Sequence, residues 1–200
     1  MTRVKNWPII NLWPRWLLAF SLLSGPALAA EPLRLAERAE YYEQVYLSEA
    51  QALQQAFGEM QVSKRLLKPT VAQRTRIQKR LRRKLDQAEL NLYIGSAEGK
   101  PQRYAFVLHE KGKHYPITFL VALSPDARVK QVAVMVYRER RGDGVKRQRF
   151  LQQFLNKGAK DPLEVNTDIV HITGSTISSW SLAAGVRKAI VLLEELVLRP

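Results

Sequence analysis

The feature that most constrains the fold is a set of three apolar segments separated by short polar turns in the middle of the chain. The segments are Tyr104 to Leu108, Ile117 to Leu123 and Val129 to Tyr137, and they are rich in the β-branched and aromatic residues that favour strands. Glu110 to Lys113 and Ser124 to Ala127 have the composition of turns. Antiparallel strands can be joined by such short turns, whereas parallel strands need a crossover of about a dozen residues or more. The sequence therefore predicts an antiparallel β-meander.

Helical signals precede this region. Ser48 and Gln51 have the spacing of a capping box, and Gly58 stands where this first helix would end. Thr70 and Gln73 repeat the capping-box spacing. The apolar residues that follow recur every three or four positions, at Ile77, Leu81, Leu85, Ala88 and Leu92. We therefore expect a second helix over residues 70–92 with one buried face.

Two further helices are expected after the strands. Phe150 to Leu155 form a short helical segment, and a longer one runs from about Ser179 to Leu198. The apolar residues of the longer helix share one face that can pack on a sheet, namely Leu182, Val186, Ile190, Leu193 and Val197. The predicted fold class is α+β, with an antiparallel β-meander sheet packed against helices that include this long C-terminal amphipathic helix.

The first 29 residues have the three parts of an export signal. Positive charge comes from Arg3, Lys5 and Arg15, Leu17 to Leu23 form an apolar core, and Ala27-Leu28-Ala29 fits the small-x-small cleavage rule. The apolar core is shorter than the roughly 20 residues that a membrane-spanning helix needs. We therefore expect a cleaved signal peptide over residues 1–29. The alternative is an uncleaved segment that anchors the protein in the inner membrane.

Residues 30–200 are then expected to form a single periplasmic domain that begins with a helical, basic segment. The chain has no cysteine, which excludes disulfides, zinc–thiolate sites, iron–sulfur clusters and thiol catalysis. Its histidines are His109, His114 and His171, and the first two miss the spacing of the zinc-protease signature by one residue. No P-loop, nucleophile elbow or dinucleotide-binding glycine motif occurs. The residues therefore indicate neither a metal site nor a catalytic group.

The run from Lys64 to Lys84 contains ten Lys or Arg residues and no Asp or Glu. On the expected helix, Arg74, Lys79, Arg82 and Arg83 would point largely to water. One interpretation is an ordinary solvated helix face. The other is a surface that attracts acidic phospholipid headgroups or an acidic redox partner. Nucleic acid is not expected as a partner, because an exported protein seldom meets it.

A hydroxyl-rich segment, Thr173-Gly174-Ser175-Thr176-Ile177-Ser178-Ser179, directly precedes the C-terminal helix. The start of a helix exposes unpaired backbone N–H groups and the positive end of the helix dipole, both of which suit a phosphate. The simpler interpretation is that Ser178 or Ser179 caps the helix. The residues alone leave both interpretations open.

This segment resembles the S/T-G-A-T-x-S/T motif of the FMN-binding domain family, which includes periplasmic flavin subunits of the Rnf and sodium-pumping NADH:quinone reductase complexes. The resemblance covers roughly residues 48–198, and residues 112–121 and 137–142 look like strand and loop segments of a stand-alone periplasmic branch. By position, it implies that Thr176 carries FMN through a phosphoester bond. The surrounding cofactor-binding residues are Thr173, Gly174, Ser175, Ile177 and Ser178. Ser175 replaces the usual Ala, and Val170 stands where many members have Asp, with Asp168 two residues upstream.

The resemblance implies an exported flavoprotein that relays electrons between extracytoplasmic or membrane redox partners, and so an electron-transfer protein rather than a stand-alone catalyst. An extracytoplasmic flavin transferase would attach the FMN. The redox partner would be a membrane or periplasmic protein, with a cytochrome as one candidate. Trp180, Tyr115 and Tyr137 are candidates for the wall beside the flavin ring. The alternative is a non-flavinylated periplasmic binding or assembly module of a membrane redox complex, which docks through the basic helix.

Overall fold

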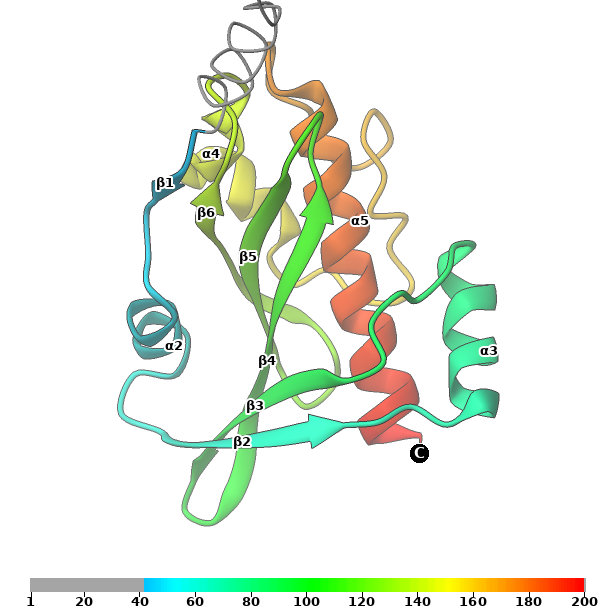
Figure 1. The fold of residues 1–200 in the computed structure, drawn as a ribbon. Helices are drawn as coiled ribbons and strands as arrows, with labels where there is room; N and C mark the ends of the chain where they lie inside the picture. The colour runs from blue at the N-terminus through cyan, green and yellow to red at the C-terminus, as the bar shows by residue number, and fades with distance from the viewer. Residues whose placement is uncertain (1–41, 200) are drawn as a thin grey trace, which may run out of the picture. The chain divides into compact units, whose positions relative to one another are not determined.

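The computed structural model describes residues 42–199, and within them six strands form one antiparallel sheet in the order β1-β6-β5-β4-β3-β2 (Figure 1). The strands are β1 (Gln44–Val45), β2 (Gln61–Leu67), β3 (Leu90–Ala97), β4 (Lys100–Lys111), β5 (Pro116–Leu123) and β6 (Val129–Tyr137). Strands β3, β4, β5 and β6 pair in succession along the chain. The α+β class and the antiparallel meander predicted from the sequence are therefore confirmed.

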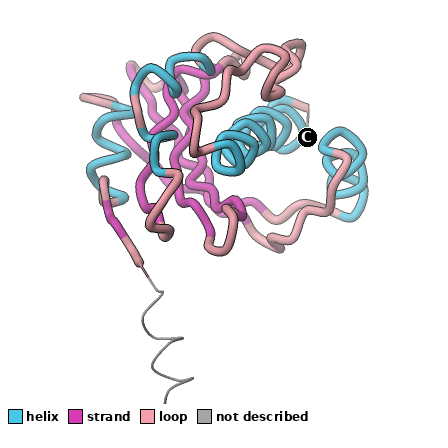
Figure 2. The backbone as a smooth tube through the Cα atoms, turned by 90° about the horizontal axis from the view of Figure 1, so that it is seen from above, coloured by secondary structure: helices cyan, strands magenta, loops and turns pink. Residues whose placement is uncertain are grey.

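Helices cover both faces of this sheet (Figure 2). The helices are α2 (Glu49–Phe57), α3 (Val71–Leu81), α4 (Gln148–Leu151) and α5 (Thr176–Leu193), and the last continues as a π-helical turn, η3 (Glu194–Leu198). Two short 3-10 turns, η1 (Asp143–Lys146) and η2 (Gln152–Phe154), lie on either side of α4. The long helix α5 packs on β4 and β5, whereas α2 packs on the opposite face. None of the described helices is long and apolar enough to cross a membrane.

The core has two layers because side chains alternate across the strands. Phe119 and Val121 of β5 face the α5 side, while Leu120 and Ala122 contact the cluster formed with α2. Burial on both faces explains why β5 is apolar apart from Thr118. The helix α5 lies so close to the sheet that a Cβ on Gly185 would come 2.2 Å from the Phe119 ring. This close packing fixes the position of α5.

The prediction of a helix over residues 70–92 is wrong for the second half of that range. It begins at the predicted cap, Thr70, but α3 ends at Leu81, and Arg82 adopts a left-handed conformation with φ 54°. Leu92 lies instead in β3, paired with Phe106 and fully buried. The apolar spacing alone did not distinguish a helix from a turn followed by a strand, since both bury the same leucines.

The structure differs from the sequence-based predictions at two other places. Strand β2 was not predicted, because all but its last residue are exposed and it lacks the alternation of a half-buried strand. The C-terminal helix begins at Thr176, three residues before the expected start. The predicted signal peptide lies outside the described residues.

Candidate functional site

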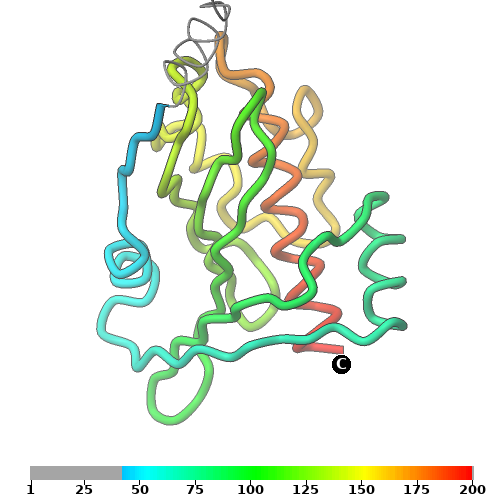
Figure 3. Tube along the Cα trace, viewed as in Figure 1, coloured from blue at the N-terminus to red at the C-terminus, as the bar shows by residue number. Residues whose placement is uncertain are grey.

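Three segments far apart in the sequence meet at one end of the sheet: the start of α5, the segment after β6 and the turn after β4 (Figure 3). The hydroxyl of Tyr137, the last residue of β6, lies 2.8 Å from Oγ of Ser178 and donates to the carbonyl of Arg141 at 2.9 Å. Ser181 Oγ donates to the carbonyl of Lys111, the last residue of β4, at 2.6 Å. The first turns of α5 are thus tied to both strands.

The hydroxyl-rich segment divides into an inner and an outer set. Ser175, Ser178 and Ser179 are buried, with exposures of 5%, 3% and 0%. Thr173, Gly174, Thr176 and Ile177 are exposed. Ser179 Oγ donates to the carbonyl of Ser175 at 2.9 Å, so this hydroxyl serves the fold. In the first turn of α5, the accessible hydroxyl is therefore that of Thr176.

The N-terminus of α5 lacks a side-chain cap. Its N-cap residue is Ser175, whose side chain does not bond the first turn, whereas α2 and α3 both begin with complete capping boxes. The first backbone bond of the helix runs from Ser179 N to the Ser175 carbonyl, at 2.9 Å. The N–H groups of Thr176, Ile177 and Ser178 therefore have no intrahelical acceptor, which is the arrangement that suits an anion.

The expectation that Ser178 or Ser179 caps this helix is wrong. Both residues lie inside the helix, and their hydroxyls point inward to Tyr137 and to the Ser175 carbonyl. Burial raises the pKa of Tyr137, so its hydroxyl remains protonated at neutral pH and keeps its donor role. Since that hydroxyl has one proton and gives it to the Arg141 carbonyl, Ser178 must donate to Tyr137.

Two glycines allow the segment after β6 to lie directly on the hydroxyl-rich segment. A Cβ on Gly142 would lie 2.6 Å from the Tyr137 hydroxyl oxygen and 3.2 Å from Ser178 Oγ, and its φ is +91°. A Cβ on Gly144 would lie 2.9 Å from Ser175 Oγ. Sequence reasoning did not assign either glycine to the site. The only signal was the Gly142-Asp143-Gly144 pattern inside a predicted loop.

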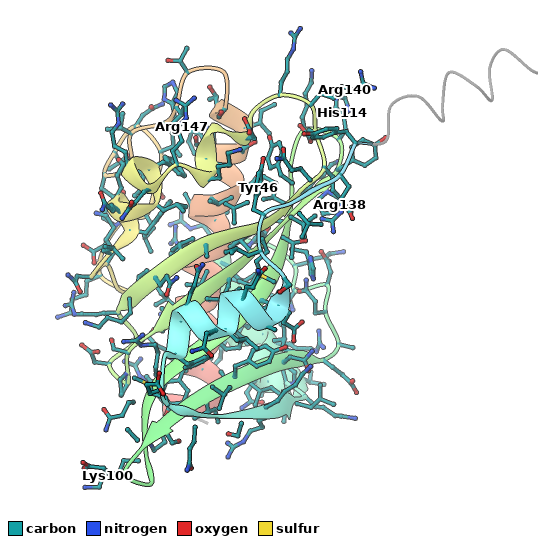
Figure 4. All side chains as sticks on the ribbon, turned by 90° about the vertical axis from the view of Figure 1, so that its left-hand side faces the viewer. Tyr46, Lys100, His114, Arg138, Arg140 and Arg147 are labelled. Atoms are coloured by element: carbon teal, nitrogen blue, oxygen red, sulfur yellow. The ribbon has the colours of Figure 1, made fainter. Side chains whose placement is uncertain are left out.

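Charged side chains surround this end of the sheet (Figure 4). Tyr46 donates to Asp143 Oδ2 at 3.1 Å, and Lys146 lies 2.8 Å from the same oxygen and 4.1 Å from the Tyr46 ring centroid. The hydrogen bond from Lys146 is the largest of the effects that hold the pKa of Asp143 below its usual range. This cluster ties η1 to Tyr46, the residue that follows β1. The sequence had not connected Tyr46 with this region.

The other candidates for chemistry have structural partners. His109 Nδ1 lies 3.0 Å from Thr118 Oγ1, and His171 Nδ1 lies 3.0 Å from Asn166 Oδ1. Among residues 42–199, no cluster of three or more His, Asp or Glu side chains could hold a metal ion. Tyr137 is fully buried and cannot form the wall of an open site, whereas Trp180 is 49% exposed and Tyr115 is half-buried.

Asp168 organises the loop that leads to the hydroxyl-rich segment. Its Oδ2 accepts from Lys157 Nζ at 2.8 Å and from Leu163 N at 3.2 Å, and its Oδ1 accepts from Glu164 N at 2.8 Å. Val170, by contrast, is 72% exposed. The carboxylate two residues upstream of Val170 thus has a clear role in the fold.

The basic run divides into paired and exposed residues. Arg76 and Arg80 form ion pairs with Glu194 and Glu195, and Arg83 binds both oxygens of Glu110 at 2.6 and 2.8 Å. Arg74 donates to three backbone carbonyls that follow α3, those of Leu85, Gln87 and Ala88. The expectation that Arg74 and Arg83 face water is therefore wrong. The other exposed members are Lys64, Arg65, Lys79, Arg82 and Lys84, while Lys68 and Arg76 are exposed beside their partners Glu89 and Glu195.

Comparison with protein-family models matches residues 112–191 to the FMN-binding domain family. The matched span contains the segment after β6, the hydroxyl-rich segment and nearly all of α5. A comparison with curated proteins gave no match.

Proposed function

We propose that this chain, whose residues 112–191 form a domain of the FMN-binding family, carries FMN as a phosphoester on Thr176 and relays electrons outside the cytoplasm. One observation carries the covalent part of this proposal. Thr176 is the first residue of α5 and is exposed, at a helix N-terminus that no side chain caps. A phosphate on its Oγ would lie beside the unpaired N–H groups of the first turn and the positive end of the helix dipole.

The neighbouring hydroxyls support the choice of Thr176. Ser178 and Ser179 are buried and hydrogen-bonded, and Ser175 packs under Gly144. Thr173 is exposed but lies in the turn before the helix, three residues from the first helical position. A phosphate attached to Thr173 would therefore be held in the turn and not in the first turn of α5. Thr176 combines exposure with that position.

The attachment chemistry balances with FAD as the donor. The Thr176 hydroxyl attacks the phosphorus of the FMN half of FAD, so an Oγ–P bond forms, the pyrophosphate P–O bond breaks, and AMP leaves with the hydroxyl proton. An extracytoplasmic flavin transferase and its Mg²⁺ supply the activation. Once bound, FMN provides reversible electron transfer. The residues of this chain hold the phosphate and set the surroundings of the ring, and the Tyr137–Ser178 contact keeps the first turn of α5 in place.

The partners and the compartment are part of the same proposal. The export signal over residues 1–29 would bring the domain into the periplasm, where it is free, peripheral to the inner membrane or anchored in it. There it meets the flavin transferase and a membrane or periplasmic redox protein, such as a cytochrome. Attachment by a phosphoester suits a carrier that must keep its cofactor when it moves between partners.

The second candidate is a non-flavinylated module that docks on a redox complex or an anionic membrane through the basic run from Lys64 to Lys84. The ion pairs of Arg76, Arg80 and Arg83 account for part of that charge through the fold itself. Lys79, Arg82 and Lys84 are the exposed residues around the end of α3 that such docking would use. Replacing all three with Gln tests this candidate, since unchanged binding to anionic vesicles would remove it.

Detection of covalent flavin on a denaturing gel tests the main proposal. The full-length protein is co-expressed with a flavin transferase of this class, and in-gel flavin fluorescence is compared for the wild type, Thr176→Ala and Thr173→Ala. We expect fluorescence in the wild type and in Thr173→Ala and none in Thr176→Ala. A fluorescent band in Thr176→Ala would show that the attachment site lies elsewhere.

A further inference from the structure

One stripe of α5 remains open along the helix, whereas most of the other residues beyond its first turn are buried. Thr176, Trp180, Ala184 and Arg187 follow one another at helical spacing, and each is exposed or half-buried. Trp180 is 49% exposed, which is unusual for so large an apolar side chain beside a polar segment. Because helical side chains lean toward the N-terminus, Trp180 covers the surface on the Thr176 side of its own backbone.

A hollow of about 200 Å³ lies along the part of this stripe formed by Trp180, Ala184 and Arg187. It is formed where α5 passes the end of α3 and the loop around Leu163. An adjoining hollow of about 210 Å³ shares Leu163 and Arg187 with the first. We call this feature the α5 groove and define it by Trp180, Arg187, Leu81, Arg83 and Leu163.

The walls of the α5 groove combine apolar surface with two guanidinium groups and the carboxylate of Glu164. Trp180, Leu81 and Leu163 supply the apolar part. Arg83 is held firmly, because it binds both oxygens of Glu110 and also lies 3.3 Å from the carbonyl of Ala184. Arg187 is held more loosely, at 3.5 Å from Glu164 Oε1. Such a lining suits a flat conjugated ring that is apolar at one end and carries carbonyl oxygens at the other end.

We propose that the α5 groove binds the isoalloxazine ring of the FMN whose phosphate lies at the start of α5, with Trp180 against the ring and Arg187 near its carbonyl edge. This inference rests on the proposed function for the position of the phosphate. Trp180 is about 6 Å along the helix axis from Thr176, a distance that the phosphate and the five-carbon ribityl chain can cover. Arginine at the carbonyl edge favours the negative charge that the ring gains on reduction.

The first test uses the full-length, flavin-loaded protein and reads the ring directly. Flavin fluorescence yield and visible circular dichroism are measured for the wild type, Trp180→Ala and Arg187→Gln, at equal flavin content per chain by absorbance. We expect a severalfold rise in fluorescence and an altered dichroism band in Trp180→Ala, because contact with an aromatic side chain quenches flavin emission. Arg187→Gln should lower the reduction potential of the flavin.

Matched controls separate these effects from general changes in the surface. Leu155→Ala removes a comparably exposed apolar side chain outside the groove, and Lys79→Gln removes an exposed cation of α3 that does not line it. Both controls should behave as the wild type. A thermal unfolding curve is recorded to check that Trp180→Ala is folded. Fluorescence and dichroism of folded Trp180→Ala identical to those of the wild type would overturn the groove assignment, whatever the state of Thr176.

A second test is independent of covalent attachment. Riboflavin, which has no phosphate, is titrated into Thr176→Ala protein, and binding is followed by quenching of its fluorescence. We expect Trp180→Ala in this background to weaken binding about tenfold, in line with the loss of stacking on an aromatic side chain. Binding that is absent up to the solubility of riboflavin, or insensitive to Trp180, would overturn the groove. Absence of covalent FMN alone would instead overturn the attachment at Thr176.

Discussion

The hydroxyl of Tyr137 lies 2.8 Å from that of Ser178, a contact that joins the end of β6 to the first turn of α5 across 41 residues of sequence. Tyr137→Phe should destabilise the protein by about 1–2 kcal/mol, because it leaves the buried Ser178 hydroxyl and the Arg141 carbonyl without this partner. Urea unfolding of Tyr137→Phe, Ser178→Ala and the double variant checks this. The double variant should cost less than the sum of the two single changes. Strict additivity would mean that the two hydroxyls do not interact.

Gly142→Ala should be more costly than an ordinary Gly-to-Ala change in a loop. An L-residue at φ +91° is strained, and the new Cβ would also lie 2.6 Å from the Tyr137 hydroxyl oxygen. Gly99→Ala is the matched control, since Gly99 has φ +72° but no atom within 4 Å of the added Cβ. Both variants carry the backbone cost of roughly 1–2 kcal/mol, and only Gly142→Ala adds the steric one. Equal melting temperatures for the two would contradict the close approach at Gly142.

The buried cluster of Glu110, Arg83 and Lys188 predicts an asymmetry between two substitutions. Lys188 Nζ lies 3.4 Å from Glu110 Oε1 and donates to Gln87 at 2.9 Å, and its burial outweighs these partners to lower its pKa. Glu110→Gln leaves two cations without their counter-charge and should cost about 3–5 kcal/mol. Lys188→Met leaves Glu110 paired with Arg83 and should change stability by about 1 kcal/mol or less. Denaturant unfolding of both variants measures the difference, and a similar cost for both would contradict this account.

Asp168 should make the stability of the protein depend on acid pH. Burial alone would raise the pKa of Asp168, but hydrogen bonds from Lys157 and from the N–H groups of Glu164 and Leu163 outweigh it and hold the pKa below its usual range. A carboxyl group whose pKa is lower in the folded state stabilises the protein above about pH 4, and this contribution is lost as the pH falls through the folded value. Asp168→Asn removes it.

We expect Asp168→Asn to cost about 1.5–3 kcal/mol near neutral pH, the range for hydrogen bonds to a charged group. The difference from the wild type should shrink steadily below about pH 4. Unfolding curves at several pH values check this. A difference that does not change with pH would mean that the charge of Asp168 has no part in holding the loop.

The strands of the meander and the starts of α2 and α3 could be predicted because their signals are local. The residues of β5 and β6 carry their own β-forming pattern, and the capping boxes of α2 and α3 are complete within four residues. The missing strand β2 has no such pattern, since its basic, exposed residues are held by pairing with β3 alone. The end of α3 was misplaced because Leu85 and Leu92 are buried by tertiary contacts that spacing cannot reveal.

The arrangement of the site depended on contacts between distant segments. Nothing local indicates that Tyr137 binds Ser178, or that Gly142 and Gly144 must lie directly against the hydroxyl-rich segment. The same holds for Arg83, which looked like a surface cation and is instead paired with Glu110. The match of residues 112–191 to the FMN-binding domain family supports the resemblance seen in the sequence. Export through residues 1–29 and the phosphoester at Thr176 stay predictions.

The most direct measurement of the central claim is the intact mass of the exported protein after the full sequence is co-expressed with the flavin transferase, followed by fragmentation of the peptide that contains residues 173–179. The account predicts a species heavier by one FMN less one water, with the modification on Thr176. An unmodified mass in protein that has met an active transferase, or a modification on Thr173 or another residue, would contradict it.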